Sequence, residues 1–177
     1  MNGISLTEPW AHLIAIGEKH YETRGWSTAY RGELAIAAAK KFPHECQALC
    51  VKNPPFTDAL VRHDITTLRP MVEAGGLILA VVEVVDCVPT TAEGCKKRLA
   101  RAPAVPPAEF EAAFGDYSPR RFAIVTTNLR RLARPVPVAH IERGISKPGG
   151  ARGIFDLPEE TIAAVRAELA GAALEVA

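Results

Sequence analysis

The sequence lacks the features that would mark a membrane protein or a disulfide-rich secreted protein. Its longest apolar runs, such as Leu77 to Val82, are far too short to cross a bilayer, and residues 1–6 do not form the blocks of a signal peptide. Its 4 cysteines match neither a Cys-x-x-Cys redox pair nor paired zinc knuckles, so reduced thiols are expected. A cytoplasmic location is the simplest expectation.

A charge excess of either sign is also missing. The 21 Lys and Arg residues nearly balance 20 Asp and Glu residues, which excludes the strong overall field of a protein that coats polyanions. Any surface for nucleic acid must therefore be local. A chain of 177 residues, 48% of them hydrophobic, can close one sizeable core, and one domain over residues 1–177 is expected.

Motifs for metal or triad chemistry are absent as well. His44, Cys46 and Cys50 could offer ligands from neighbouring helical turns, but no fourth ligand follows nearby, so we expect neither a metal nor a cofactor. The histidines show no triad spacing, and no Gly-x-Ser-x-Gly or phosphate-loop pattern is present. These absences leave binding functions and metal-independent hydrolysis open.

Helical and strand patterns do not alternate regularly, which argues against a doubly wound parallel sheet. Helices are expected over 8–16, 43–52, 57–71, 107–114 and from 158 to the C-terminus. Strands are expected over 21–26, 33–39, 77–87 and 122–132, with a bent continuation over 133–138, an irregular excursion over 88–107 and a loop over 146–153. These elements predict an α+β fold, a small bent sheet or barrel decorated by helices.

The junction between the first helix and the first predicted strand carries a run of charged residues. Thr7 is expected to cap the helix, and Gly17 is expected to end it. Along the strand, alternation places every second residue from Glu22 to Trp26 on one side. A locally charged surface beside the helix is therefore predicted.

Three separated segments together suggest a family. They are Gly17 to Arg24 with Trp10 upstream, Tyr30-Arg31-Gly32, and Gly115 to Pro119. Their order resembles the ASCH domain family of the PUA-like group of small β-barrels, with the Gly-x-Lys-x-x-Glu-x-Arg core at Gly17, Lys19, Glu22 and Arg24. The resemblance runs from about residue 4 to about residue 157.

This resemblance implies a barrel with a cleft beside the helix-strand junction and a role in binding RNA or nucleotides. Aromatic faces can stack on bases, and cationic side chains can contact phosphate. The predicted ligand-binding residues are Trp10, Lys19, Glu22, Arg24, Trp26, Arg31, Tyr117 and Ser118. The oligomeric state is left open.

Related small proteins resemble amidohydrolases that act on acetylated cytidine through a Lys, a Thr three residues later and a strand Glu. Lys19 and Glu83 fit this pattern and are the catalytic candidates, but Glu22 occupies the Thr position, and Thr23 should face the other side of the strand. Glu83 interrupts an apolar strand and must be paired or neutral there, so we expect Lys19 as its partner. A ribonuclease, an amidohydrolase on an acylated nucleoside such as N4-acetylcytidine, a protein-interaction module and a simple surface ion-pair network remain alternatives.

Basic residues cluster in two further places. Five arginines lie between 120 and 134, and Lys96, Lys97 and Arg98 lie in the predicted excursion. They could supply phosphate contacts or solvated charge on an edge strand.

Overall fold

A computed structural model describes residues 1–90, 108–138 and 153–175. Its strands are β1 (Asn2–Leu6), β2 (Tyr21–Arg24), β3 (Gly32–Ala38), β4 (Leu77–Pro89), β5 (Phe122–Pro137) and β6 (Ile154–Asp156). Its helices are α1 (Trp10–Ala15), α2 (His44–Lys52), α3 (Pro54–Val61), α4 (Arg69–Glu73), the 3-10 helix η1 (Ala108–Phe114) and α6 (Glu159–Glu175).

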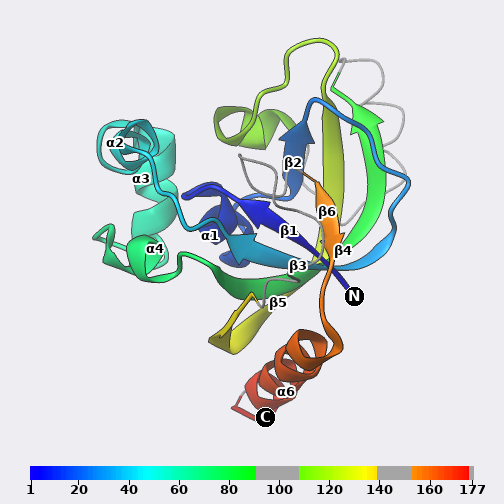
Figure 1. Ribbon diagram of the computed structural model, residues 1–177. Coiled ribbons are helices and arrows are strands. Elements are labelled where there is room, and N and C mark those ends of the chain that lie inside the picture. Colours follow the sequence, from blue (N-terminus) through cyan, green and yellow to red (C-terminus); the bar gives the residue numbers. More distant parts are fainter. Residues whose placement is uncertain (91–107, 139–152, 176–177) are drawn as a thin grey trace.

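The strands form one sheet in the order β2-β5-β4-β3-β1-β6, in which β1 and β3 run parallel and the other pairs are antiparallel. The sheet curls into a half-barrel, and α2, α3 and α4 gather on one side of it (Figure 1). The predicted α+β fold, a small PUA-like barrel decorated by helices, is confirmed. Among the described residues, no helix combines the length and apolar character needed to span a bilayer.

Opposite faces of the sheet are covered by different helices. On the inner face, Leu34 and Ile36 of β3 pack with Ile14 of α1, whereas the alternate residue Ala35 packs with Val165 of α6 on the outer face. This alternation follows from the period-2 side-chain pattern of a strand. It separates the side of the sheet that carries α1 from the side that carries α6.

One expected helix differs from the structure, and two strands were not expected. The helix predicted over 57–71 is two helices, because Pro70 starts a new helix and cannot extend an existing one, and Asp64 between them has a φ of 60°. The N-terminal β1 and the three-residue β6 were not predicted, since such short strands carry little pattern of their own. The predicted strand over 122–132 and its continuation over 133–138 form the single strand β5. Pro135 lies where the register between β5 and β4 shifts.

The cap of the first helix also differs from the prediction. Glu8, which is fully buried, accepts a hydrogen bond from the backbone N–H of His12 at 3.2 Å, and its other oxygen lies 2.7 Å from His12 Nδ1. No side-chain hydrogen bond from Thr7 caps the helix. The carboxylate therefore takes the capping role expected of the hydroxyl.

Helix α6 is tied to the sheet by a carboxylate of β3. Glu33 accepts hydrogen bonds from Arg166 at 2.8 Å and from Arg130 at 2.6 Å. Hydrogen bonds from these two guanidinium groups lower the pKa of Glu33 from 4.5 to about 2, and the larger effect comes from Arg166. The pairs therefore stabilise the fold fully above pH 4.5 and lose this contribution as the pH falls through about 2.

Glu33→Gln should remove this acid-sensitive contribution. Between pH 5 and pH 2, the free energy of unfolding should fall by about 1 kcal/mol more for wild type than for Glu33→Gln. This difference allows for the screening of the partly exposed pairs by solvent. Urea unfolding at the two pH values measures the difference. Glu73→Gln, at the exposed pair with Arg69, is the matched control and should follow wild type. Parallel pH profiles for wild type and Glu33→Gln would contradict the prediction.

Candidate ligand-binding site

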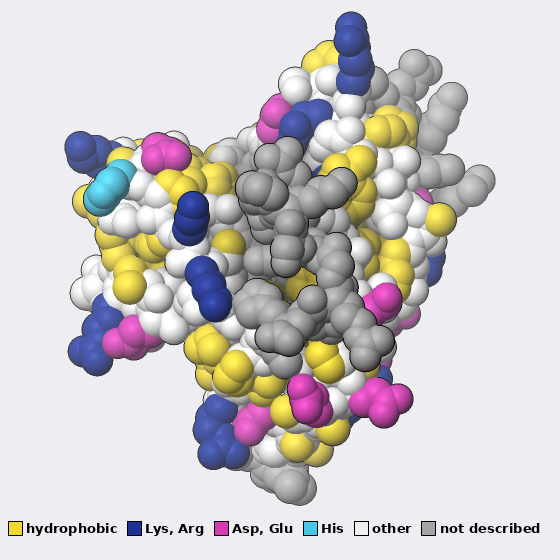
Figure 2. All heavy atoms as spheres, in the orientation of Figure 1, with side chains coloured by type: hydrophobic (Ala, Val, Ile, Leu, Met, Phe, Trp, Pro, Cys, Tyr) yellow, Lys and Arg dark blue, Asp and Glu magenta, His cyan; other side chains and the backbone are white. Residues whose placement is uncertain are grey.

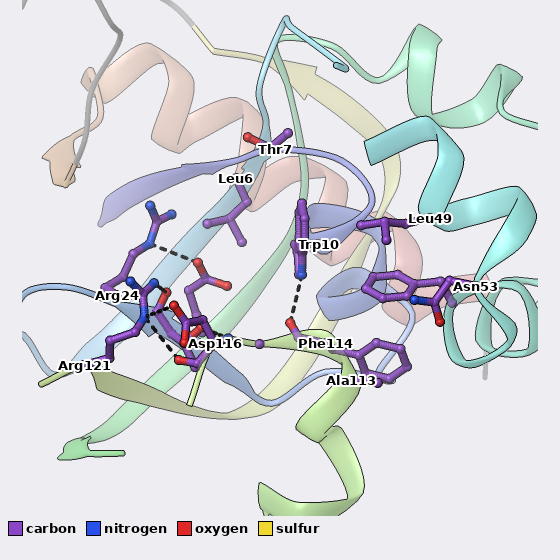
Figure 3. A pocket seen from close by; sticks show the side chains of 14 residues that line it. Leu6, Thr7, Trp10, Arg24, Leu49, Asn53, Ala113, Phe114, Asp116 and Arg121 are labelled. Carbon is purple, nitrogen blue, oxygen red and sulfur yellow. Dashed lines mark hydrogen bonds and ion pairs between the residues drawn. The ribbon is translucent and has the colours of Figure 1, made fainter. Parts of the chain in front are cut away.

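A cavity of about 430 Å³ opens where β1, α1, β2, η1 and the α2–α3 junction meet (Figure 3). Its volume lies in the range of small-molecule sites. Trp10 stands between a charged side, which carries Arg24, Asp116 and Arg121, and a side that carries Leu49 and Asn53. The full lining is Leu6, Thr7, Trp10, Glu22, Thr23, Arg24, Leu49, Asn53, Phe56, Ala113, Phe114, Gly115, Asp116 and Arg121.

Three aromatic side chains build the apolar side of the cavity. Trp10 is half-buried, and its Nε1 donates a hydrogen bond to the carbonyl of Phe114 at 2.8 Å. The ring of Phe56 meets Trp10 edge-on with the centroids 6.1 Å apart, and it meets Phe114 edge-on at 5.1 Å. The indole of Trp10 is thus held in place while part of it remains accessible.

The charged side begins on β2, where burial alternates as predicted. Tyr21 and Thr23 are buried, whereas Glu22 and Arg24 are partly exposed. One Glu22 oxygen lies 2.9 Å from Arg24 Nε, and the other lies 3.7 Å from the ammonium of Lys19. Glu22 therefore bridges a buried cation and a cation at the cavity.

Arg121, the residue before β5, completes the charged side. Its Nε lies 3.1 Å from a carboxylate oxygen of Asp116, and its Nη2 donates to the carbonyl of Thr23 at 3.3 Å. Hydrogen bonds from Ser118 lower the pKa of Asp116, and the charge of Arg121 acts in the same direction. The cavity thus holds two guanidinium groups, each beside one carboxylate.

Lys19 lies behind this surface. Its side chain is 1% exposed, and its ammonium donates a hydrogen bond to the carbonyl of Tyr21. Burial lowers the pKa of Lys19, while the negative charges of Glu22 and Glu111 oppose the shift. Lys19 also lines a second cavity of about 130 Å³, on the side of His20 and Asn128. It therefore serves Glu22 as a counter-charge and does not form the surface of the larger cavity.

The expected pairing of Lys19 with Glu83 is wrong. Glu83 is exposed and lies opposite Glu33 in the β3–β4 register, and Glu33 contacts α6 on the outer face of the sheet. Lys19 instead lines a cavity with Ile14 of α1, on the inner face. Because Glu83 stands near the end of the buried part of β4, exposure to water solvates its charge without a buried partner.

Residues 4–133 match the family described as the ASCH domain. The chain belongs to the ASCH domain family. It is also 34% identical over 85 residues to "Activating signal cointegrator 1" from Homo sapiens and to the protein of the same name from Mus musculus. The alignment covers 48% of this chain and 14% of each relative, so the chain spans only a small part of their length. The family match ends within β5, earlier than residue 157, and leaves β6 and α6 beyond it.

Of the eight ligand-binding residues predicted for this ASCH domain, the described lining contains Trp10, Glu22 and Arg24. Arg31 is exposed and donates to Asp86 at 2.8 Å, and Trp26 packs against the core of the half-barrel. Tyr117 packs near Tyr21 on another face. The backbone N–H of Ser118 donates to Asp116 at 3.0 Å. These four residues are not part of the described lining of the cavity.

Sequence reasoning missed most of the cavity lining that comes from outside β2 and α1. Phe56 and Asn53 come from the α2–α3 junction, where the pattern shows only helical packing. Asp116 resembles an ordinary turn residue. The contribution of Arg121 was foreseen only as part of a basic flank. Tertiary contacts alone bring these segments to β2.

Two further arginines of the described chain pair on the side of the sheet that carries α6. Arg130 and Arg134 pair with Glu33 and Glu168 on the α6 side, whereas Lys96, Lys97 and Arg98 lie outside the described residues. On the face shown in Figure 2, Lys and Arg side chains stand apart, with Asp and Glu side chains among them. Within the described lining of the larger cavity, the cationic side chains are those of Arg24 and Arg121.

The described residues contain no candidate metal-binding group. Within residues 1–90, 108–138 and 153–175, no three His, Cys, Asp or Glu side chains are grouped to hold an ion. Cys46 and Cys50 are buried in α2, and burial raises the pKa of Cys50 to about 11. A thiol with this pKa is protonated and unreactive near neutral pH.

Proposed function

We propose that this ASCH domain binds single-stranded RNA or a nucleotide in the cavity between Trp10 and the two arginines. The observation that carries the proposal is the presence, in one cavity of about 430 Å³, of an anchored indole and two guanidinium groups. An aromatic face accepts any base, and guanidinium groups match phosphate oxygens. The combination suits a ligand with an aromatic part and an anionic part.

Each side chain has a distinct role in this proposal. Trp10 stacks on a base, while Arg24 and Arg121 contact phosphate oxygens. Glu22 and Asp116 hold the guanidinium groups in place, so less conformational entropy is lost on binding. Lys19 does not contact the ligand in this proposal; its charge helps to hold Glu22, which in turn orients Arg24.

Single-stranded RNA fits this site better than duplex RNA. Stacking on Trp10 requires a base that is free to leave its neighbours, which an unpaired strand provides. A net charge of +1 also gives no broad surface for a duplex backbone. Tyr117 and Ser118, which directly follow Asp116, are proposed contacts for a flanking nucleotide, and Trp26 and Arg31 are proposed peripheral contacts.

Salt dependence tests the proposed phosphate contacts. Two contacts predict a log–log slope of about −1.4 for a single strand, so affinity should fall about sevenfold between 50 and 200 mM salt. Fluorescence anisotropy with a labelled RNA of about ten nucleotides measures this slope. An abasic strand of equal length is the matched control for stacking and should bind more weakly.

Tryptophan fluorescence reports on the base. The chain has 2 tryptophans, so Trp26→Phe leaves Trp10 as the reporter, and RNA should quench its emission. Absence of binding to RNA and mononucleotides at low salt would refute the proposal. Mass analysis of the same mixtures, with N4-acetylcytidine included, detects hydrolysis; turnover would favour an enzyme in this cavity.

A further inference from the structure

Glu111 holds together two parts of the chain that are far apart in sequence. It lies on η1, is 3% exposed, and accepts hydrogen bonds from the backbone N–H groups of His20 and Tyr21 at 2.8 and 3.1 Å. Its Oε1 also lies 2.7 Å from His20 Nδ1. One carboxylate thereby attaches η1 to the first residues of β2.

The residues that follow Glu111 form one wall of the cavity. Phe114, Gly115 and Asp116 line it, whereas Glu111 itself is absent from the described lining. The wall touches the opposite side directly, because Trp10 donates to Phe114 and the backbone N–H of Asp116 donates to the Thr23 hydroxyl at 3.0 Å. Glu111 is thus a buried residue of the same short segment whose Phe114 carbonyl accepts the hydrogen bond of Trp10.

Gly115, in the middle of this wall, packs closely against two neighbouring side chains. A Cβ on Gly115 would stand 2.9 Å from the ring of Tyr117, closer than real Cβ atoms approach, and 3.0 Å from the Thr23 methyl group, a tighter contact than most. Gly115→Ala therefore offers a way to displace the wall without changing Glu111.

We propose that Glu111 is a positioning residue of the binding cavity, which acts through the η1 wall on Trp10. This inference rests on the proposed function for its effect on affinity. Loss of the carboxylate leaves the backbone amides of His20 and Tyr21 without this acceptor and removes one of the negative charges that favour protonated Lys19. The wall would then shift relative to Trp10, which weakens stacking.

Three substitutions test the proposal. Glu111→Ala should weaken binding of a labelled single-stranded RNA about tenfold. Glu111→Gln should stay within about threefold of wild type, because its carbonyl oxygen can still accept from the amides. The matched control is Glu168→Ala, which removes a carboxylate that binds Arg134 through three hydrogen bonds on the α6 side, and its RNA affinity should be unchanged.

The indole N–H resonance of Trp10 is the second readout, assigned by its loss in Trp10→Phe. It should move in Glu111→Ala and in Gly115→Ala, but not in Glu168→Ala, because the indole donates to the carbonyl of Phe114 in the wall. If Glu111→Ala does not fold, Gly115→Ala still tests whether the η1 wall positions Trp10, and Glu111→Gln tests whether a neutral acceptor at this position is enough to hold the wall.

The outcomes separate this inference from the proposed function. Wild-type affinity in Glu111→Ala with an unmoved Trp10 resonance, or wild-type affinity in Gly115→Ala despite a moved resonance, overturns the positioning role and leaves RNA binding intact. If wild type itself binds neither RNA nor mononucleotides, the proposed function fails. In that case a moved resonance in Glu111→Ala still supports the positioning of Trp10 by Glu111, and an unmoved one refutes it.

Discussion

Replacing Arg24 and Arg121 together by glutamine is expected to weaken binding of single-stranded RNA about a hundredfold, since each charge-assisted contact contributes about 1.5 kcal/mol or more. Both guanidinium groups line one cavity, and both stand beside a carboxylate that orients them. The salt slope should become shallower by about 1.4, because two phosphate contacts are lost. Anisotropy titrations across a salt series measure both quantities.

The matched control removes the same amount of charge from two arginines of β5. Arg131 and Arg134 are exposed and lie outside the cavity lining, so their double glutamine variant should bind within about threefold of wild type. An equal loss in both double variants would show that net charge, and not the cavity, determines affinity. Thermal unfolding of each variant verifies that the folded state is retained.

Lys19→Ala is expected to lower the free energy of unfolding by about 2–4 kcal/mol, because it empties a buried site and leaves Glu22 without one of its cations. Lys19→Met should cost no more than about 1.5 kcal/mol, since it fills a similar volume. Chemical denaturation at pH 7 measures both. RNA affinity of Lys19→Met should remain within about threefold, because the ammonium is sealed behind Tyr21 and Glu22.

The lowered pKa of Lys19 adds a test with a definite sign. The folded protein binds this proton less tightly than the unfolded chain, so the stability of wild type relative to Lys19→Met should rise as the pH increases toward 10.5. A falling difference would mean that the buried amine is favoured in its charged form. A stable Lys19→Met that loses RNA binding or turnover would contradict the expectation that the ammonium supports the fold more than the ligand, and would assign it a role at the site, either directly or through Glu22.

Local chemistry made part of this site predictable. Alternation along β2 placed Glu22 and Arg24 together, and the Gly-x-Lys-x-x-Glu-x-Arg core indicated both the family and the junction where the cavity lies. The partner of Lys19 was not predictable from the same reasoning. A lone carboxylate in an apolar strand suggested burial, but Glu83 belongs to the outer face, where water solvates it.

By itself, the sequence determined the fold class, most of the helices and strands and the charged junction from Gly17 to Arg24, because these depend on periodicity and neighbouring residues. The tertiary structure alone decided that Glu22, and not Glu83, faces Lys19, and that Phe56, Asp116, Arg121 and Glu111 surround this junction. Such contacts depend on how the sheet curls and on which face of a strand meets α1. Segments about ninety residues apart, such as η1 and β2, carry no local signal of the other's position.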